Sequence, residues 1–529
     1  MQGKKQLQPK MLYTVTLEQL VPADNFYRRI NKVLNLHWLY AATKNYYGIE
    51  GQESIDPVVF FKMCMIGYIN NIGSDRKLAD RCGDSLGIRL FLGYDIDEPL
   101  PWHSTISRTR QLYGDEVFKK LFEQVFEKCI ESGMIAGHTQ AIDGALLKAN
   151  ASKDSLEIKQ VSKSVDAYLS ENIKADTTPR RPAKHNHADD EQQHMDGDDE
   201  EQERQLKELD TRYQRQEKNY EEMPGSERGK YLSNKTHYSP SDPDSRIAVK
   251  PGKPRDMYYS GQIAVDTAHH VITHAATFTA DGKDCRDFIT IATQLQTRMQ
   301  QQGIAIEKIL ADAAYSSGEN YQYLERERIT GYIPLLGGAV SGSEGFIYDE
   351  INDWYICRNN KLLKGSGRIV DDGRGHPVKK YFSLQRDCKN CPIRKSCITD
   401  KAKTKKVQHS IYKAELERAK ARQQTVKAKV MKRKRSSTVE PVWGTLINFM
   451  GMKRINARGL AAANKTLILA AACYNLKKWL RFISPMSNIK TMVMLQTKAR
   501  EVFELIKNVF TSLIVGQNVA VCFLPIHSW

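Results

Sequence analysis

The sequence predicts an α/β core preceded by an all-helical N-terminal region, and three observations indicate this fold class. Apolar residues recur at helical spacing over residues 1–130. The pattern changes to strand-like stretches at about residue 137, and strands and helices then alternate over residues 257–336. A chain that alternates in this way is expected to form a mixed sheet covered by helices.

Residues 1–130 are expected to form a helical domain that binds DNA. A short helix is predicted over residues 75–92, and the stretch PWHSTISRTR begins a polar helix near Ser104. Two short helices, the second carrying Arg108 and Arg110, suit a helix-turn-helix-like module in which both arginines contact DNA. The alternative is a plain helical bundle with a basic surface.

The core is expected to begin with the strand HTQAIDGALLKANAS at residues 138–152. The stretches MYYSGQIAVDT and HVITHAATFTA predict a hairpin that turns near His269 and His270. The elements expected after it are a helix over 285–302, a strand ending at Asp312, a helix over 318–329 and a strand over 330–336.

Two insertions are expected to interrupt this core. Between Asp189 and Glu222 the chain has 14 acidic and 5 basic residues, so this segment should be solvated. The second insertion carries a group of cysteines. The expected units are the helical domain (1–130), the core (131–153 and 231–340), the acidic insertion (154–230), the cysteine insertion (341–400), a basic segment with helices (401–482) and a C-terminal helical tail (483–529).

The charge of the chain indicates a polyanionic partner. It has 79 basic and 62 acidic residues, a net charge of +17, and nucleic acid is the commonest partner of such a protein. Residues 401–435 hold 14 Lys and Arg against two Glu, and their cations, Lys432, Arg433 and Arg435 among them, are expected to contact DNA phosphates. The alternative is an ordinary solvated basic face.

Several classes of protein are disfavoured. The sequence has no run of about 18 apolar residues, so no membrane span is expected. The start, MQGKKQLQPKMLYTV, lacks the apolar segment of a signal peptide. Most of the ten cysteines are scattered, as in a reducing cytosol. We therefore expect a cytoplasmic protein that associates with the nucleoid.

Three acids in the core suggest a cation site. Asp143 lies inside a predicted core strand, where a carboxylate is costly unless it is paired or binds a metal. Asp312 ends a later strand, and the ends of neighbouring parallel strands bring distant residues together. Glu440, expected near a helix start, would approach them, and divalent cations such as Mg²⁺ would offset the repulsion. Alternatively each acid is an ordinary polar residue, Glu440 being favoured by the helix dipole.

The stretches that carry these acids resemble the DDE-class transposases of bacterial insertion sequences, in particular insertion-sequence family 1182. The similar stretches are AIDGALLKANAS, YSGQIAVD, ILADAAYSSGENYQYL, STVEPVWGTLINFMGMKRINARGL and, nearer the start, SDRKLADRC and PWHSTISRTR. The resemblance implies an RNase H-like core, recognition of DNA ends and two Mg²⁺ or Mn²⁺ ions per site. Asp143, Asp312 and Glu440 match the family's three catalytic, metal-binding acids.

The chain departs from the family around its glutamate. Related transposases often have an Arg four residues before the glutamate and a Lys seven residues after it, where this chain has Ser436 and Ile447. Arg435 and Lys453 lie nearby and are the expected substitutes. Arg454 and Arg458 are further candidates for DNA contact.

The function implied by the resemblance is DNA transposition. The protein would bind the terminal inverted repeats, cleave the phosphodiester bond at the element's end and join the freed 3′-hydroxyl to target DNA. Pairing of two ends implies a homodimer. Two alternatives are a DNA-binding regulator without catalysis, derived from a transposase, and a general nuclease of the same fold.

Four cysteines suggest a second metal site. Cys388 and Cys391 form a CxxC pair, and Cys357 and Cys397 lie nearby in sequence. Four thiolates suit a tetrahedral, structural Zn²⁺. The alternative is a set of reduced cysteines that pack a small insertion.

Overall fold

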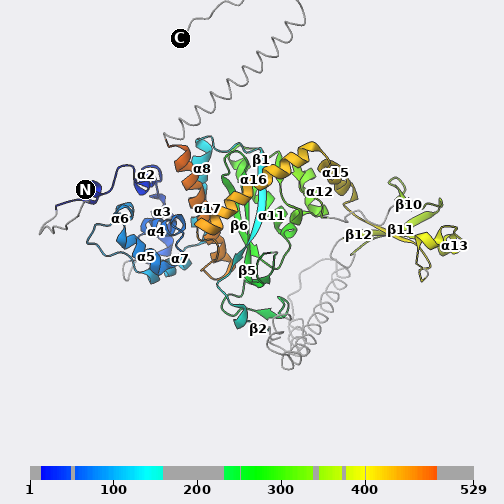
Figure 1. Ribbon diagram of the computed structural model, residues 1–529, viewed down its shortest axis with the longest axis horizontal. Coiled ribbons are helices and arrows are strands. Elements are labelled where there is room, and N and C mark those ends of the chain that lie inside the picture. The colour runs from blue at the N-terminus through cyan, green and yellow to red at the C-terminus, as the bar shows by residue number, and fades with distance from the viewer. Residues whose placement is uncertain are drawn as a thin grey trace, which may run out of the picture.

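The computed structural model describes residues 14–48, 54–158, 232–250, 252–336, 345–371, 377–399 and 401–484. Most of the predicted acidic insertion and nearly all of the predicted C-terminal tail lie outside these residues. Figure 1 shows a lobe of helices, a central sheet flanked by helices, and a second sheet that projects at the far end from that lobe.

The N-terminal lobe is helical, as predicted. Helix α4 is apolar on all sides and largely buried. Asp56 caps it by accepting hydrogen bonds from the backbone N–H groups of Val58 and Val59. The helices are α1 (Leu17–Leu20), α2 (Phe26–Val33), α3 (Trp38–Thr43), η1 (Lys44–Tyr46), α4 (Pro57–Ile69), α5 (Asp75–Asp84), α6 (Leu86–Leu92), α7 (His103–Leu112) and α8 (Asp115–Glu131).

The central sheet is mixed, which confirms the predicted α/β class. Its strands run in the order β4-β5-β1-β7-β8, and β6 also pairs with β5. The predicted hairpin is β5–β6, and it turns at His270, whose φ is 56°. Strand β1 is antiparallel to β5 and parallel to β7. The strands are β1 (Thr139–Lys148), β4 (Arg246–Ala248), β5 (Asp256–Asp266), β6 (Ile272–Thr279), β7 (Lys308–Leu310) and β8 (Thr330–Tyr332).

Helices pack around this sheet. Helix α17 is buried over most of its length and packs against both α8 and β6, so it joins the N-terminal lobe to the sheet in one hydrophobic core. Helix α16 crosses the sheet next to β1 (Figure 1). The helices of this part are α11 (Asp284–Gln301), η4 (Ala313–Tyr315), α12 (Gly318–Arg326), α15 (Lys413–Gln423), α16 (Val426–Phe449) and α17 (Leu460–Phe482).

The second sheet is antiparallel and runs in the order β13-β12-β11-β10-β9. It extends to Ser410, past the expected end of the cysteine insertion at residue 400, because Val407 of β13 is buried with Tyr355, Leu363 and Tyr381. Its elements are β9 (Ile347–Asp349), β10 (Trp354–Ile356), β11 (Leu362–Asp371), β12 (Pro377–Ser383), α13 (Gln385–Lys389), α14 (Arg394–Cys397) and β13 (Lys406–Ser410).

A small ribbon flanks the acidic insertion in sequence. Strand β2 (Glu157–Ile158) follows η2 (Lys153–Ser155) and pairs with β3 (His237–Tyr238). Within the described ranges, no helix is long and apolar enough to cross a membrane.

Candidate active site

Asp143 and Asp312 come together because β1 and β7 are parallel neighbours. The last residue pair of the two strands is Ala141 with Leu310. Each aspartate lies two residues beyond that pair, so both occupy the same level of the sheet. The side chain of Asp143 is 17% exposed and Asp312 is half-buried. Asp312 follows the end of β7, but Asp143 lies inside β1 and not at its end. The strand pairing places the two aspartates on neighbouring strands, and their joint role in catalysis stays a prediction.

The two carboxylates act on each other electrostatically. Burial raises the pKa of Asp143 to about 6; the Arg435 cation opposes this shift, and the Asp312 carboxylate adds to it. The Asp312 side chain is held in place because its Oδ1 accepts a hydrogen bond from the Ala314 backbone N–H at 2.9 Å, which caps η4. The site thus contains two nearby negative charges with little solvent around Asp143.

Glu440 lies in the middle of a helix, so the expectation that it begins one is wrong. Helix α16 begins at Val426, where the Thr425 hydroxyl accepts from the Ala428 N–H, and it continues past Pro441 to Phe449. Proline removes a backbone donor but does not end this helix, which is held on both sides of Pro441 by packing. A helix-dipole role for Glu440 is excluded by this position.

Arg435 bridges Glu440 and Asp143. Its Nη1 lies 3.6 Å from Asp143 Oδ2, and its Nη2 lies 3.5 Å from Glu440 Oε1. The Arg435 side chain is 14% exposed, whereas that of Glu440 is 61% exposed. This arginine, predicted from the sequence as a DNA contact, therefore places its positive charge between two of the three acids.

Trp443 holds α16 against the strand that carries Asp143. Its ring is buried, and its Nε1–H donates to the Asp143 backbone carbonyl at 3.4 Å. Gly261 of β5 leaves room for the ring, since a Cβ there would lie 3.1 Å from the Trp443 ring. The helix face that bears Arg435 and Glu440 is thereby aligned with β1.

The donor set suits a hard divalent cation. Carboxylate oxygens are the ligands that Mg²⁺ and Mn²⁺ prefer. Among the described residues, no three His, Cys, Asp or Glu side chains lie close enough together to hold one ion jointly. In this conformation Arg435 provides the positive charge between Asp143 and Glu440. The three carboxylates therefore fit the cation by their chemistry, and joint binding of a cation by Asp143, Asp312 and Glu440 stays a prediction.

Arg108 and Arg110 have different environments. Arg108 is exposed on α7 and contacts only Ser104 of its own helix among the hydrogen bonds of the described chain. Arg110 donates to both carboxylate oxygens of Asp75, at 2.8 and 2.9 Å, and so ties α7 to α5. Arg108 is free to contact DNA, whereas Arg110 has a structural partner that a DNA contact would replace. Both contacts stay predictions.

The other predicted DNA-contacting residues lie along α16 and the loop after it. This loop lies beside the end of β1. Arg454 donates to Asn150 Oδ1 at 2.7 Å, and the Ile455 N–H donates to the Lys148 carbonyl at 2.8 Å. These predicted residues are all exposed: Lys432, Arg433, Lys453, Arg454 and Arg458.

The four cysteines of the predicted zinc site are partly exposed thiols in the second sheet and its helices. Cys357 Sγ accepts backbone N–H groups from Asn359 and Lys361, and the Asn359 side chain reaches Cys391 Sγ at 3.7 Å. Cys388 Sγ lies 3.0 Å from Ser383 Oγ. Among the described residues these three cysteines and Cys397 are not gathered into one ligand set, and zinc binding stays a prediction.

Sequence reasoning missed a buried polar group behind the aspartates. Tyr315, three residues after Asp312, is fully buried, and burial together with the charges of Asp284, Asp143 and Asp312 raises its pKa. Its hydroxyl donates to Gln262, which also contacts Asp284. Only Tyr315 carried a signal in the sequence, which is its proximity to Asp312. Gln262 joins the site through the pairing of β5 with β1, and Asp284 joins it from the start of α11.

Comparison with protein families gives two matches. Residues 15–112 match a transposase domain (DUF772), and residues 356–480 match a transposase DDE domain. The first range contains Arg108 and Arg110, and the second contains Glu440. No curated protein matches the chain significantly. The specific likeness to insertion-sequence family 1182 stays a prediction. Together the two matches support a DDE-type transposase of an insertion sequence.

Proposed function

We propose that this transposase binds the ends of its insertion sequence, cleaves the phosphodiester bond there and joins the freed 3′-hydroxyl to target DNA. The observation that supports it is the position of Asp143 and Asp312 on the parallel neighbours β1 and β7, each two residues beyond the last pair, with Arg435 linking Asp143 to Glu440. The mixed sheet, with Asp143 inside β1 and Asp312 just after the neighbouring strand β7, supports an RNase H-like core.

In this proposal, Asp143 and Asp312 hold divalent cations, and Glu440 completes the set of ligands. Two Mg²⁺ or Mn²⁺ ions there supply the positive charge that activates an attacking oxygen and stabilises a leaving one in phosphoryl transfer. Asp143 carries a proton below about pH 6 and a negative charge above it, so it is a ligand at neutral pH. Arg435, released from the carboxylates, is then placed to contact a DNA phosphate.

The DNA would reach this site along exposed cations. Lys432 and Arg433 precede Glu440 on α16, and Arg454 lies beside the end of β1. Such cations bind phosphates without reading sequence, and the resulting affinity falls with salt. The N-terminal helices, with Arg108 exposed on α7, would bind the element's ends. Joining two ends in one reaction requires two copies of the chain.

The test compares the parent protein with Asp312→Asn on end-containing DNA in Mg²⁺. Asparagine caps a helix as well as aspartate does, so the substitution removes charge with little loss of local structure. Asp56→Asn is the matched control, because Asp56 also caps a helix, α4, and lies far from Asp312 in sequence. We expect specific cleavage by the parent and by Asp56→Asn, and none by Asp312→Asn.

The other results of this cleavage assay would favour different conclusions. Equal cleavage by parent and Asp312→Asn would overturn the proposed site. Binding of the ends by the parent without cleavage would favour the regulator, and cleavage without joining would favour the general nuclease.

A further inference from the structure

The structure contains a buried glutamine that contacts the segments carrying both aspartates. We propose that Gln262 is a positioning residue that sets the separation of Asp143 and Asp312 and thereby the affinity of their pocket for divalent cations. This inference rests on the proposed function, in which those two acids bind the cations.

Gln262 supports β1 from behind. It lies on β5 directly opposite Gly144, the residue after Asp143, and its side chain is fully buried. Successive residues of a strand point to opposite faces, so Gln262 packs on the face away from the Asp143 carboxylate. A Cβ at Gly144 would lie 2.5 Å from Gln262 Nε2, so only glycine leaves room for this amide against the backbone. With Trp443 on the other face, β1 is held from both sides.

The same amide anchors the segment of Asp312. Gln262 Oε1 accepts a hydrogen bond from the hydroxyl of Tyr315, which belongs to the short helix that Asp312 caps. Gln262 Nε2 donates to Asp284 Oδ1 and to Ser260 Oγ, each at 3.0 Å. Because an ionised carboxylate only accepts hydrogen bonds, Asp284 fixes the Nε2 end of the amide toward itself and the Oε1 end toward Tyr315.

Lys250 offsets the negative charge that Asp284 brings to the site. Asp284 is a further carboxylate close to the aspartates, and its side chain is only 11% exposed. Lys250 Nζ lies 3.1 Å from Asp284 Oδ2 and offsets its charge. Asp284 therefore orients Gln262 without adding a full negative charge to a pocket that already holds two acids.

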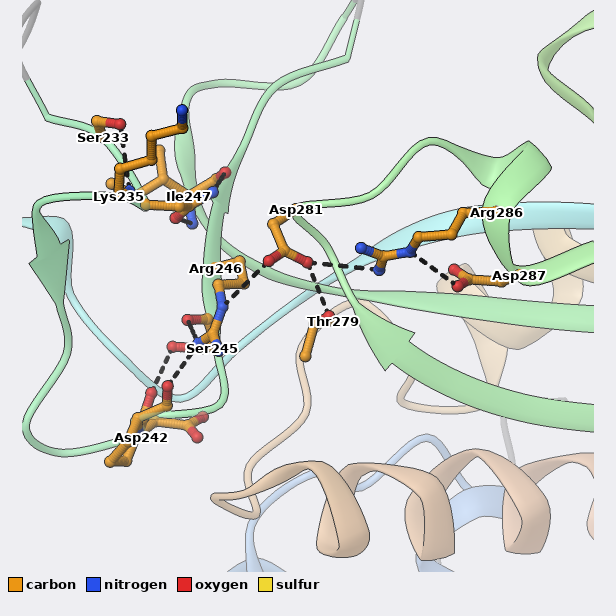
Figure 2. Close-up of polar contacts among 12 residues, drawn as sticks. Ser233, Lys235, Asp242, Ser245, Arg246, Ile247, Thr279, Asp281, Arg286 and Asp287 are labelled. Atoms are coloured by element: carbon orange, nitrogen blue, oxygen red, sulfur yellow. Dashed lines mark hydrogen bonds and ion pairs between the residues drawn. The ribbon is translucent and has the colours of Figure 1, made fainter. Parts of the chain in front are cut away.

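A neighbouring ion-pair network keeps Lys250 and Asp284 together. Asp281 accepts a hydrogen bond from Thr279 Oγ1 at 2.7 Å and lies 3.6 Å from both Arg246 of β4 and Arg286 of α11 (Figure 2). Strand β4 leads to Lys250, and α11 begins with Asp284. The two segments that carry the pair are thus joined at a second point.

The physical consequence concerns the cation. Two carboxylates with little water between them repel each other, and in the absence of a cation they would move apart unless the backbone holds them. Gln262 links the backbone next to Asp143 to the helix after Asp312, so it resists that movement. Removing a group that orients metal ligands typically weakens metal binding about 10–100-fold. We expect a loss of that size when Gln262 can no longer hydrogen-bond.

The test measures Mn²⁺ binding to the full chain without DNA, by electron paramagnetic resonance, so that no turnover is involved. Gln262→Leu is compared with the parent and with Gln140→Leu. Gln140 is the matched control: it is also a fully buried glutamine of this sheet, but its amide binds Gly137 and Asp266. We expect Gln262→Leu to raise the dissociation constant about 10–100-fold and Gln140→Leu to leave it within about twofold.

Tyr315→Phe keeps the ring and removes only the hydroxyl, so it decides the question if Gln262→Leu does not fold. It should raise the dissociation constant several-fold, with an unfolding midpoint close to the parent's. Parent-like Mn²⁺ binding by Gln262→Leu or, if that variant is unfolded, by Tyr315→Phe would overturn the proposal. An equal loss in folded Gln140→Leu would also overturn it.

Asp143→Asn separates this inference from the proposed function. If Asp143→Asn binds Mn²⁺ as the parent does, the proposed cation site itself is wrong. If Asp143→Asn loses binding while Gln262→Leu keeps it, only the positioning role of Gln262 is wrong.

Discussion

The central sheet and the second sheet of this transposase differ in how much of their surface is covered. Nearly every residue of β5 is buried between helices, whereas β11 is exposed along most of its length. The core of the second sheet is a small cluster formed around Tyr355, Leu363, Tyr381 and Val407. Figure 1 shows this sheet projecting from the body of the protein.

From this difference we expect the central sheet and the second sheet to have different roles. The buried sheet holds carboxylates at fixed positions, where lost solvent strengthens every electrostatic interaction. The projecting sheet presents cations to solvent, among them Lys364 and Arg368 of β11. We therefore expect the proposed chemistry to depend on the buried sheet, and surface contact with DNA phosphates to come from the projecting sheet.

The largest expected effect is on cleavage. Asp143→Ala should reduce strand cleavage on the order of 10³-fold, because it removes a cation ligand of the proposed site. Lys364→Ala, on the second sheet, should change the cleavage rate constant at saturating DNA by less than about threefold. Single-turnover cleavage assays measure both rates, and equal losses would break the division between the two sheets.

The next effect is on local stability. Leu363→Ala should cost about 2–5 kcal/mol, since it opens a cavity in a core with few other members. Hydrogen exchange should speed up in the second sheet and stay unchanged in β1 and β5. Leu147→Ala, in the buried strand β1, is the matched change and should lower protection across the central sheet instead. Global loss of protection in Leu363→Ala would contradict this picture.

Loss of a carboxylate should change the free energy of unfolding with opposite signs in the two sheets. The pKa of Asp143 is raised to about 6, so the folded state binds more protons than the unfolded state between about pH 4 and 6, and stability falls as pH rises through that range. Asp143→Asn should therefore stabilise the protein by about 1–3 kcal/mol at pH 7–8, with the gain vanishing near pH 4.

Asp353 in the second sheet supplies the contrast. Hydrogen bonds from Tyr348 and Tyr381 lower its pKa to about 2, so its stabilising effect is present above about pH 4 and is lost as pH falls toward 2. Asp353→Asn should therefore destabilise the second sheet at neutral pH. Denaturant unfolding of both variants at pH 4 and pH 7.5 measures the signs, and a shared sign would contradict the two pKa shifts.

The smallest effect concerns single phosphate contacts. Arg368→Ala should weaken DNA binding only a few-fold and equally for all sequences, and it should lower the slope of log affinity against log salt by about 1. Fluorescence anisotropy at several salt concentrations measures that slope. An unchanged slope would mean that this exposed arginine does not touch DNA.

Much of the local structure was predictable because it depends on neighbours in sequence. The β5–β6 hairpin turns at His270 as expected, and the helices expected over residues 285–302 and 318–329 form as α11 and α12. The expectation that Glu440 lies near a helix start was wrong. The helix instead runs through Pro441, since its packing against β1 outweighs one lost hydrogen bond.

The sequence by itself determined which side chains carry the chemistry: three acids in recognisable surroundings and an excess of cations. Only the tertiary structure decided which residues neighbour these acids. Arg435 lies between Asp143 and Glu440, and Gln262 reaches Tyr315, because strand register and the path of α16 set these distances. Local patterns reveal the period of a helix or strand, but partners separated by tens to hundreds of residues are chosen by packing of the whole chain.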